Sequence, residues 1–148
     1  MLSTLAIEVN SLSIHLVRFA RRADAALGVP PARLSALSVL VFGGDRTMRE
    51  LADAEQVTMA TMSRVVDGLE VSGLASRRAN PDDARSWIVR ATAKGRRVME
   101  RGRAARVERL SAILETIPGE ELANVERALA LLRDGLTAVA ATEVAHDL

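Results

Sequence analysis

Two helix-capping signals, eleven residues apart, constrain the middle of this chain more than any other feature. Thr47 and Glu50 have the spacing of a capping box, in which a hydroxyl and a carboxylate each accept a backbone N–H group at a helix start. They predict a short helix over residues 48–55, and Thr58 then begins a second helix, which Gly73 ends. The second helix has an apolar face formed by Met62, Val65, Val66 and Leu69. Two short helices joined by a tight turn predict a helix-turn-helix.

A β-hairpin is predicted directly after this pair of helices. Residues 74–79 and 86–91 have the character of strands, and the connection between them contains the turn-forming run Asn80-Pro81-Asp82-Asp83. Trp87, on the second strand, is expected to pack beneath the hairpin, with lining a pocket as the alternative. The remaining segments are predicted helices over residues 4–27, about 93–116 and about 120–145, and one that Pro30-Pro31 can start and Gly43-Gly44 ends. The predicted fold class is therefore mainly α with a small β-hairpin wing, a winged helix-turn-helix.

The charge is distributed very unevenly along the chain. The formal net charge is only +1, yet residues 74–109 carry 11 basic and 4 acidic side chains. The last segment, 110–148, has the opposite balance, with 2 basic and 7 acidic side chains. A concentrated basic segment is the usual electrostatic signature of a protein that binds a phosphate backbone.

Composition argues against several other classes of protein. The chain has no Cys, which excludes a disulfide framework, a thiolate nucleophile and a thiol redox sensor. It has two His and lacks the sequence motifs of hydrolases, nucleotide-binding loops and zinc proteases, so we expect no enzyme activity, no cofactor and no metal site. The longest uncharged apolar run, residues 34–44, is too short to span a membrane, and we expect a cytoplasmic protein.

Three short motifs follow one another in the central segment. They are Leu69-Glu70-Val71-Ser72-Gly73-Leu74-Ala75-Ser76-Arg77-Arg78, Pro81-Asp82-Asp83-Ala84-Arg85 and Thr92-Ala93-Lys94-Gly95. In this order and spacing they resemble the MarR family of bacterial transcription regulators, with one departure at Ala91, where the family usually has Leu. The resemblance implies an intertwined winged-helix homodimer that binds double-stranded DNA at a palindromic operator, often under the control of a small-molecule effector.

The candidate DNA-reading residues lie on the outward face of the second helix and on the wing. Small and hydroxyl side chains near a helix N-terminus allow close approach to a groove floor, and Arg binds guanine or phosphate. The candidates are Thr58, Met59, Ala60, Thr61, Ser63, Arg64, Arg77, Arg78 and Arg85. An ordinary amphipathic helix with a solvated polar face is the alternative for the helix. Two questions stay open: whether Arg85 contacts DNA or holds the wing together, and whether Asp67 or Asp83 pairs with a wing Arg.

Apolar stripes on the first and last helices exceed what one small lobe can cover, so we expect a homodimer. The predicted organisation is an N-terminal dimerisation helix (1–29), a winged helix-turn-helix lobe (30–95) and C-terminal linker and dimerisation helices (96–148). A small aromatic or phenolic acid is the expected effector, and its candidate lining residues are His15, Arg18, Phe19 and Phe42. The expected function is a transcriptional regulator of the repressor type that binds DNA; a dimeric protein-interaction module that does not read DNA is the alternative.

Overall fold

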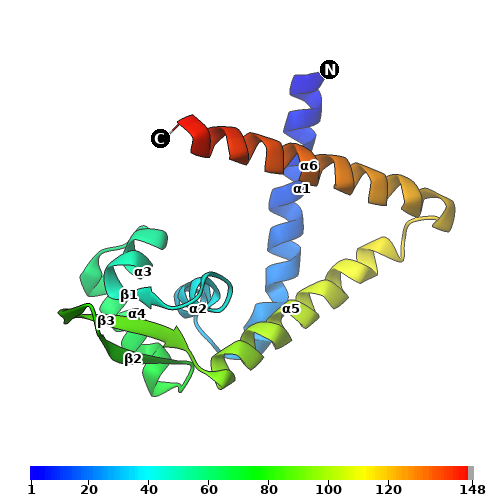
Figure 1. Cartoon of the computed structure of the whole chain (residues 1–148). Coiled ribbons are helices and arrows are strands. Elements are labelled where there is room, and N and C mark those ends of the chain that lie inside the picture. Colours follow the sequence, from blue (N-terminus) through cyan, green and yellow to red (C-terminus); the bar gives the residue numbers. More distant parts are fainter. Residues whose placement is uncertain (147–148) are drawn as a thin grey trace. The chain divides into compact units, whose positions relative to one another are not determined.

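The computed structural model describes residues 1–146, in two compact units: Met1–Arg109, and a second unit that begins at Leu110. In chain order the elements are α1 (Leu2–Arg21), η1 (Arg22–Leu27), α2 (Pro31–Gly43), β1 (Arg46–Thr47), α3 (Met48–Ala54), α4 (Met59–Val71), β2 (Ala75–Asn80), β3 (Asp83–Ala91), α5 (Ala93–Leu114), η2 (Gly119–Glu121) and α6 (Leu122–His146). Figure 1 shows α2, α3, α4 and the small sheet gathered into one lobe. The predicted winged helix-turn-helix is confirmed.

Both predicted helix caps are present. Thr47 Oγ1 accepts the backbone N–H of Glu50 at 3.2 Å, and Glu50 Oε2 accepts the backbone N–H of Thr47 at 2.7 Å, which completes the capping box. Hydrogen bonds from the backbone and then the side chain of Thr47 lower the pKa of Glu50, and the nearby Arg46 adds to this. At the next helix, Thr58 Oγ1 accepts the backbone N–H of Thr61 at 3.2 Å. These bonds satisfy N–H groups that a helix start otherwise leaves without partners.

The sheet has three antiparallel strands in the order β1-β3-β2, with Arg77 of β2 opposite Val89 of β3. The short strand β1 was not predicted, because two residues carry no alternating pattern that could reveal a strand. The wing turn is also tighter than predicted, since β2 reaches Asn80 and β3 already begins at Asp83. Asn80 keeps the hairpin closed, because its Nδ2 donates to Ser86 Oγ at 2.8 Å and its Oδ1 accepts the Asp82 N–H at 3.1 Å.

One apolar core joins the helix-turn-helix to the sheet. Its fully buried members come from α2, α3, α4, the turn before β2, and β3: Leu37, Leu51, Met62, Val66, Leu69, Leu74 and Val89. Burying a Leu, Val or Met side chain contributes about 1.5–3 kcal/mol relative to leaving it exposed. The core therefore fixes α4 and the wing in one rigid arrangement.

The predicted helix over residues 4–27 is wrong in its last part. The α-helix ends at Arg21, a 3₁₀ segment runs from there to Leu27, and Gly28 with φ 66° ends it. The tighter 3₁₀ winding places Asp24 against Arg106 of α5, with 2.6 Å between Oδ1 and Nη1. The spacing of apolar residues cannot reveal an ion pair between two charged residues that are far apart in the sequence. The apolar pattern therefore predicted one continuous helix.

Large apolar side chains stay exposed on α1 and on α6. They include Leu5 (56%) and Leu12 (58%) on α1, and Leu129 (60%) and Leu136 (72%) on α6. Among the described residues, no single helix is long and apolar enough to cross a membrane. One pair of helical segments, Leu2–Leu27 and Pro31–Gly43, matches a span by length and composition only, and it is bent by 98°.

Candidate nucleic-acid interface

The first half of α4 presents an open polar surface. Thr58, Met59, Ala60, Thr61 and Arg64 are exposed, and Ser63 is half-buried. Their orientation follows from the buried face of the same helix, because residues three and four apart lie on one side of a helix. The N-terminal end of a helix also carries a partial positive charge and free N–H groups, which favour a phosphate group.

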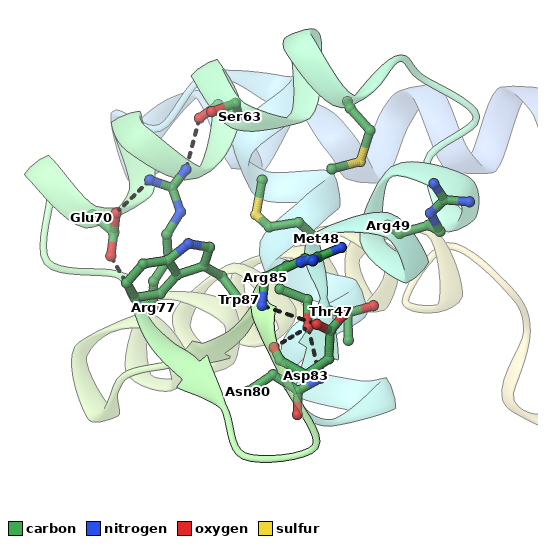
Figure 2. Close-up of a pocket in the computed structure, with 12 residues that line it drawn as sticks. Thr47, Met48, Arg49, Ser63, Glu70, Arg77, Asn80, Asp83, Arg85 and Trp87 are labelled. Carbon is green, nitrogen blue, oxygen red and sulfur yellow. Dashed lines mark hydrogen bonds and ion pairs between the residues drawn. The ribbon is translucent and has the colours of Figure 1, made fainter.

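Arg77 ties the wing to α4. Its Nη1 lies 2.6 Å from Asp67 Oδ1 and 3.2 Å from Glu70 Oε2, and its Nη2 donates to the Ser63 carbonyl oxygen at 3.2 Å. Its backbone N–H also donates to Glu70 Oε1 at 2.8 Å. Figure 2 shows the side chain extending from the wing to Ser63 and Glu70. Of the two carboxylates expected to pair with a wing Arg, Asp67 does so.

The other two wing arginines are far less engaged. Arg78 is exposed, and its Nη2 lies 3.8 Å from Asp45 Oδ2, a weak surface pair. Arg85 is exposed, and among residues 1–146 its guanidinium takes part in no ion pair or hydrogen bond. Asp83 accepts the backbone N–H of Arg85 at 3.0 Å, so it shapes the turn without occupying that guanidinium. Arg85 therefore offers a free cation at the wing.

A groove of about 980 Å³ runs between α4, the start of α3 and the wing. Met59, Ser63, Arg77 and Arg85 were predicted as site residues and line it together. Sequence reasoning did not place most of the other lining residues, which are Thr47, Met48, Arg49, Glu70, Asn80, Asp83 and Ser86, whereas lining a pocket was the alternative for Trp87, which completes the groove. The expectation that Trp87 packs beneath the wing is wrong, since it is 52% exposed and faces this groove. Trp87 is two residues from the buried Val89 and so shares its face of β3, but it lies nearer the wing tip, beyond the buried core.

The four residues predicted to line an effector pocket border neither of the two cavities described for the single chain, and their role stays a prediction. His15 is exposed on α1, where its Nδ1 lies 2.7 Å from the Ser11 carbonyl oxygen, and Phe42 is 69% exposed at the end of α2. Arg18 is exposed, and Phe19 lies under the Arg109 guanidinium at 4.4 Å from its ring centre. A cavity of about 490 Å³ lies elsewhere in the first unit, lined by Arg21, Asp24, Ala25, Val29, Pro31, Leu34, Ser35, Ser38, Met99 and Arg106.

Comparison with known proteins agrees with this geometry. The model of the MarR family matches residues 27–86, which contain α2, α3, α4 and most of the wing. The chain is 26% identical over 118 residues to the HTH-type transcriptional regulator YdgJ from Bacillus subtilis, covering 80% of this chain and 72% of that protein. It is 29% identical over 96 residues to the HTH-type transcriptional repressor YetL from the same species, covering 64% and 58%.

Solved structures share the fold. The transcriptional regulator Tm0710 from Thermotoga maritima superposes with a TM-score of 0.84 at 21% identity, covering 92% of this chain and 96% of that one. A mutant of MepR from S. aureus, bound to an oligodeoxyribonucleotide, superposes with a TM-score of 0.70 at 19% identity, covering 89% of this chain and 97% of that one. The family match over residues 27–86, the related regulators and the shared winged-helix fold together show that this chain is similar to the MarR family of transcriptional regulators.

Proposed function

We propose that the chain binds double-stranded DNA sequence-specifically, as a homodimer, at a pseudo-palindromic operator. One observation carries this proposal: the exposed half of α4 and the free guanidinium of Arg85 border the same groove. A free guanidinium beside an exposed polar helix face is suited to bind a phosphate backbone, and the protein-interaction alternative gives no reason for this arrangement. The DNA-bound MepR structure has the same fold and supports this use of it.

In this proposal α4 enters the major groove by its N-terminal half. Thr61 and Arg64 are suited to base edges, because a hydroxyl bonds several bases and a guanidinium binds guanine through two bonds. Met59 and Ala60 are suited to the methyl group of thymine. Arg85 then reaches the phosphates or the minor groove beside the wing, where narrow A·T tracts attract Arg. Arg77 supports the wing from inside through its contacts with α4.

The homodimer in this proposal forms through α1 and α6, whose large apolar side chains are exposed in the single chain. Covering them with the same helices of a second copy is the simplest way to bury them. Residues 1–29 and 96–148 then serve dimerisation, and residues 30–95 form the DNA-binding lobe. A two-fold dimer presents its two recognition helices about one DNA turn apart, which requires a pseudo-palindromic site.

A repressor released by a small molecule is the regulatory form we propose. YetL, which is a repressor, is similar to this chain over 64% of its length. The cavity of about 490 Å³ combines apolar walls with the exposed Arg21, which suits a small aromatic acid, whereas Arg106 at its edge is already paired with Asp24. A ligand there changes DNA affinity only if it binds the two forms of the dimer unequally.

The test is selection of bound duplexes from a random pool, followed by sequencing. We expect an enriched pseudo-palindrome, protein of twice the chain mass in size-exclusion chromatography with light scattering, and affinity that falls steeply with salt. Selection that enriches no sequence, or enriches only an asymmetric half-site, would contradict the proposal.

A further inference from the structure

The start of α5 is fastened to the end of α4. Lys94 Nζ donates to the carbonyl oxygen of Ser72 at 2.8 Å, and Thr92 Oγ1 donates to the carbonyl oxygen of Gly73 at 2.7 Å. The last carbonyl groups of a helix have no partners within it, and the helix dipole gives that end a partial negative charge. Lys94 therefore places a positive charge at the C-terminal end of α4, where the helix dipole stabilises it.

The backbone segments around this contact are hydrogen-bonded and closely packed. The Thr92 N–H donates to the Leu74 carbonyl oxygen at 3.0 Å, and Thr92 Oγ1 accepts the Gly95 N–H at 3.1 Å. A Cβ atom at Gly95 would overlap the Leu74 carbonyl oxygen and meet Leu37 Cδ1 at 3.0 Å. Glycine thus permits α5 to approach the turn after α4 at backbone contact distance.

Lys94 contacts the end of α4 opposite to the candidate DNA-reading residues Thr58 to Arg64. The helix has 13 residues from Met59 to Val71, so its ends are about 18 Å apart at 1.5 Å per residue. Lys94 is also the only Lys of the chain and belongs to the strongly basic segment 74–109. Its charge adds to the basic count, yet its nitrogen is engaged within the lobe.

We propose that Lys94 is a positioning residue for DNA recognition, acting through the recognition helix and making no contact with DNA itself. With Thr92 it forms a latch on the Ser72 and Gly73 carbonyl oxygens that sets the angle of α4 relative to α5. A small tilt at this end displaces the reading end about 18 Å away, where binding geometry must hold to about 0.5 Å. The inference rests on the proposed DNA-binding function.

The absence of Cys and the single Lys permit a chemical rescue. In Lys94→Cys, 2-bromoethylamine restores an ammonium group at nearly the length of Lys, whereas methyl methanethiosulfonate leaves a neutral group without a donor. Wild-type protein treated with each reagent is the matched control, because it reports any reaction at Met. Lys94→Met, which keeps an apolar stem, and Lys94→Arg, which keeps the cation, are measured beside them.

Affinity for the selected operator and for an unrelated duplex is measured across a salt series. We expect Lys94→Met and the neutral adduct to lose about fivefold or more in operator affinity, with unchanged binding of the unrelated duplex. The slope of log K against log salt stays at its wild-type value, and the aminoethyl adduct and Lys94→Arg recover operator affinity to within about twofold. Hydrogen exchange at the Ser72, Gly73 and Leu74 amides becomes faster in Lys94→Met.

Each other result overturns the inference. Operator affinity equal to wild type in Lys94→Met shows that no latch is needed. A slope reduced by about one per protomer, with equal loss on both duplexes, shows that Lys94 binds phosphate directly. Loss that aminoethylation does not restore shows that the charge is irrelevant. If wild type binds no duplex specifically, the proposed function fails and with it the role of Lys94, while the exchange rates still show whether the latch exists.

Discussion

Arg77 and Arg85 lie eight residues apart on the same wing and have opposite expected roles. Arg77 is bound to Asp67, Glu70 and the Ser63 carbonyl oxygen, whereas the Arg85 guanidinium has no such contact among residues 1–146. Replacing each by Met removes the charge and keeps most of the apolar stem. The two variants form a matched pair in which the same chemical change should produce different losses.

The expected loss for Arg77→Met follows from its contacts. Asp67 is 56% exposed, so solvent screens that pair and it contributes about 0.5 kcal/mol. Glu70 is 33% exposed, and we assign that pair about 1 kcal/mol at most. The hydrogen bond to the Ser63 carbonyl oxygen adds about 1 kcal/mol. The total of about 2 kcal/mol lowers Tm by about 6 °C for a chain of this length. Arg85→Met should change stability by less than about 0.5 kcal/mol.

Thermal and urea unfolding at one fixed protein concentration measure the stability term, because a dimer's Tm depends on concentration. Operator binding across a salt series measures the contribution to DNA binding. Arg85→Met should reduce the magnitude of the slope of log K against log salt by about one per protomer. The double variant Arg77→Met with Asp67→Asn should lose less than the sum of the two single losses. Equal Tm values for Arg77→Met and Arg85→Met, or additive losses in the cycle, would refute the reasoning.

Three further predictions concern other parts of the chain. Gly95→Ala should destabilise by about 2 kcal/mol or more in urea unfolding, because its Cβ meets the Leu74 carbonyl oxygen; stability equal to that of the wild type would contradict this. Leu12→Glu, on the exposed stripe of α1, should shift the light-scattering mass to that of one chain; an unchanged mass would exclude α1 from the interface. The pKa of the Glu50 carboxylate is lowered, so the stability it contributes is fully present above pH 4.5 and is lost as the pH falls through the folded-state pKa. Glu50→Gln should therefore weaken the fall in the free energy of unfolding between these two pH values. An unchanged fall at acidic pH would contradict this.

The fold was largely predictable because its signals are local. A capping box depends on residues three apart, and it placed the start of α3 at Met48 as observed. The cap at Thr58 placed α4 in the same way. The end of α1 was not predictable, because the 3₁₀ segment is held by Asp24 against Arg106, which lies 82 residues away. Strand β1 depends likewise on pairing with β3, and its two residues have no pattern of their own.

The site was predictable in residue type and less so in role. All three wing arginines look alike in the sequence, and only the distances separate Arg77, which pairs with carboxylates of α4, from Arg85, whose guanidinium is free. Sequence reasoning anticipated an acidic partner for a wing Arg, and Asp67 is that partner. It expected Trp87 to be covered beneath the wing, but the buried core on that face of β3 ends at Val89, and Trp87 is 52% exposed beyond it.

The same distinction limits what the basic segment can contribute to DNA binding. Residues 74–109 carry 11 basic side chains, but five use their charged nitrogens in hydrogen bonds within the first unit: Arg77, Lys94, Arg96, Arg106 and Arg109. On α3, α4 and the wing, the exposed arginines among the described residues are Arg49, Arg64, Arg78, Arg85 and Arg90. If each neutralises one phosphate, a dimer makes about ten contacts and the slope of log K against log salt is about −9. Counting every basic residue of the segment would instead predict about −20. A slope near that larger value would mean that the internal contacts of α5 and the wing break when the protein binds DNA.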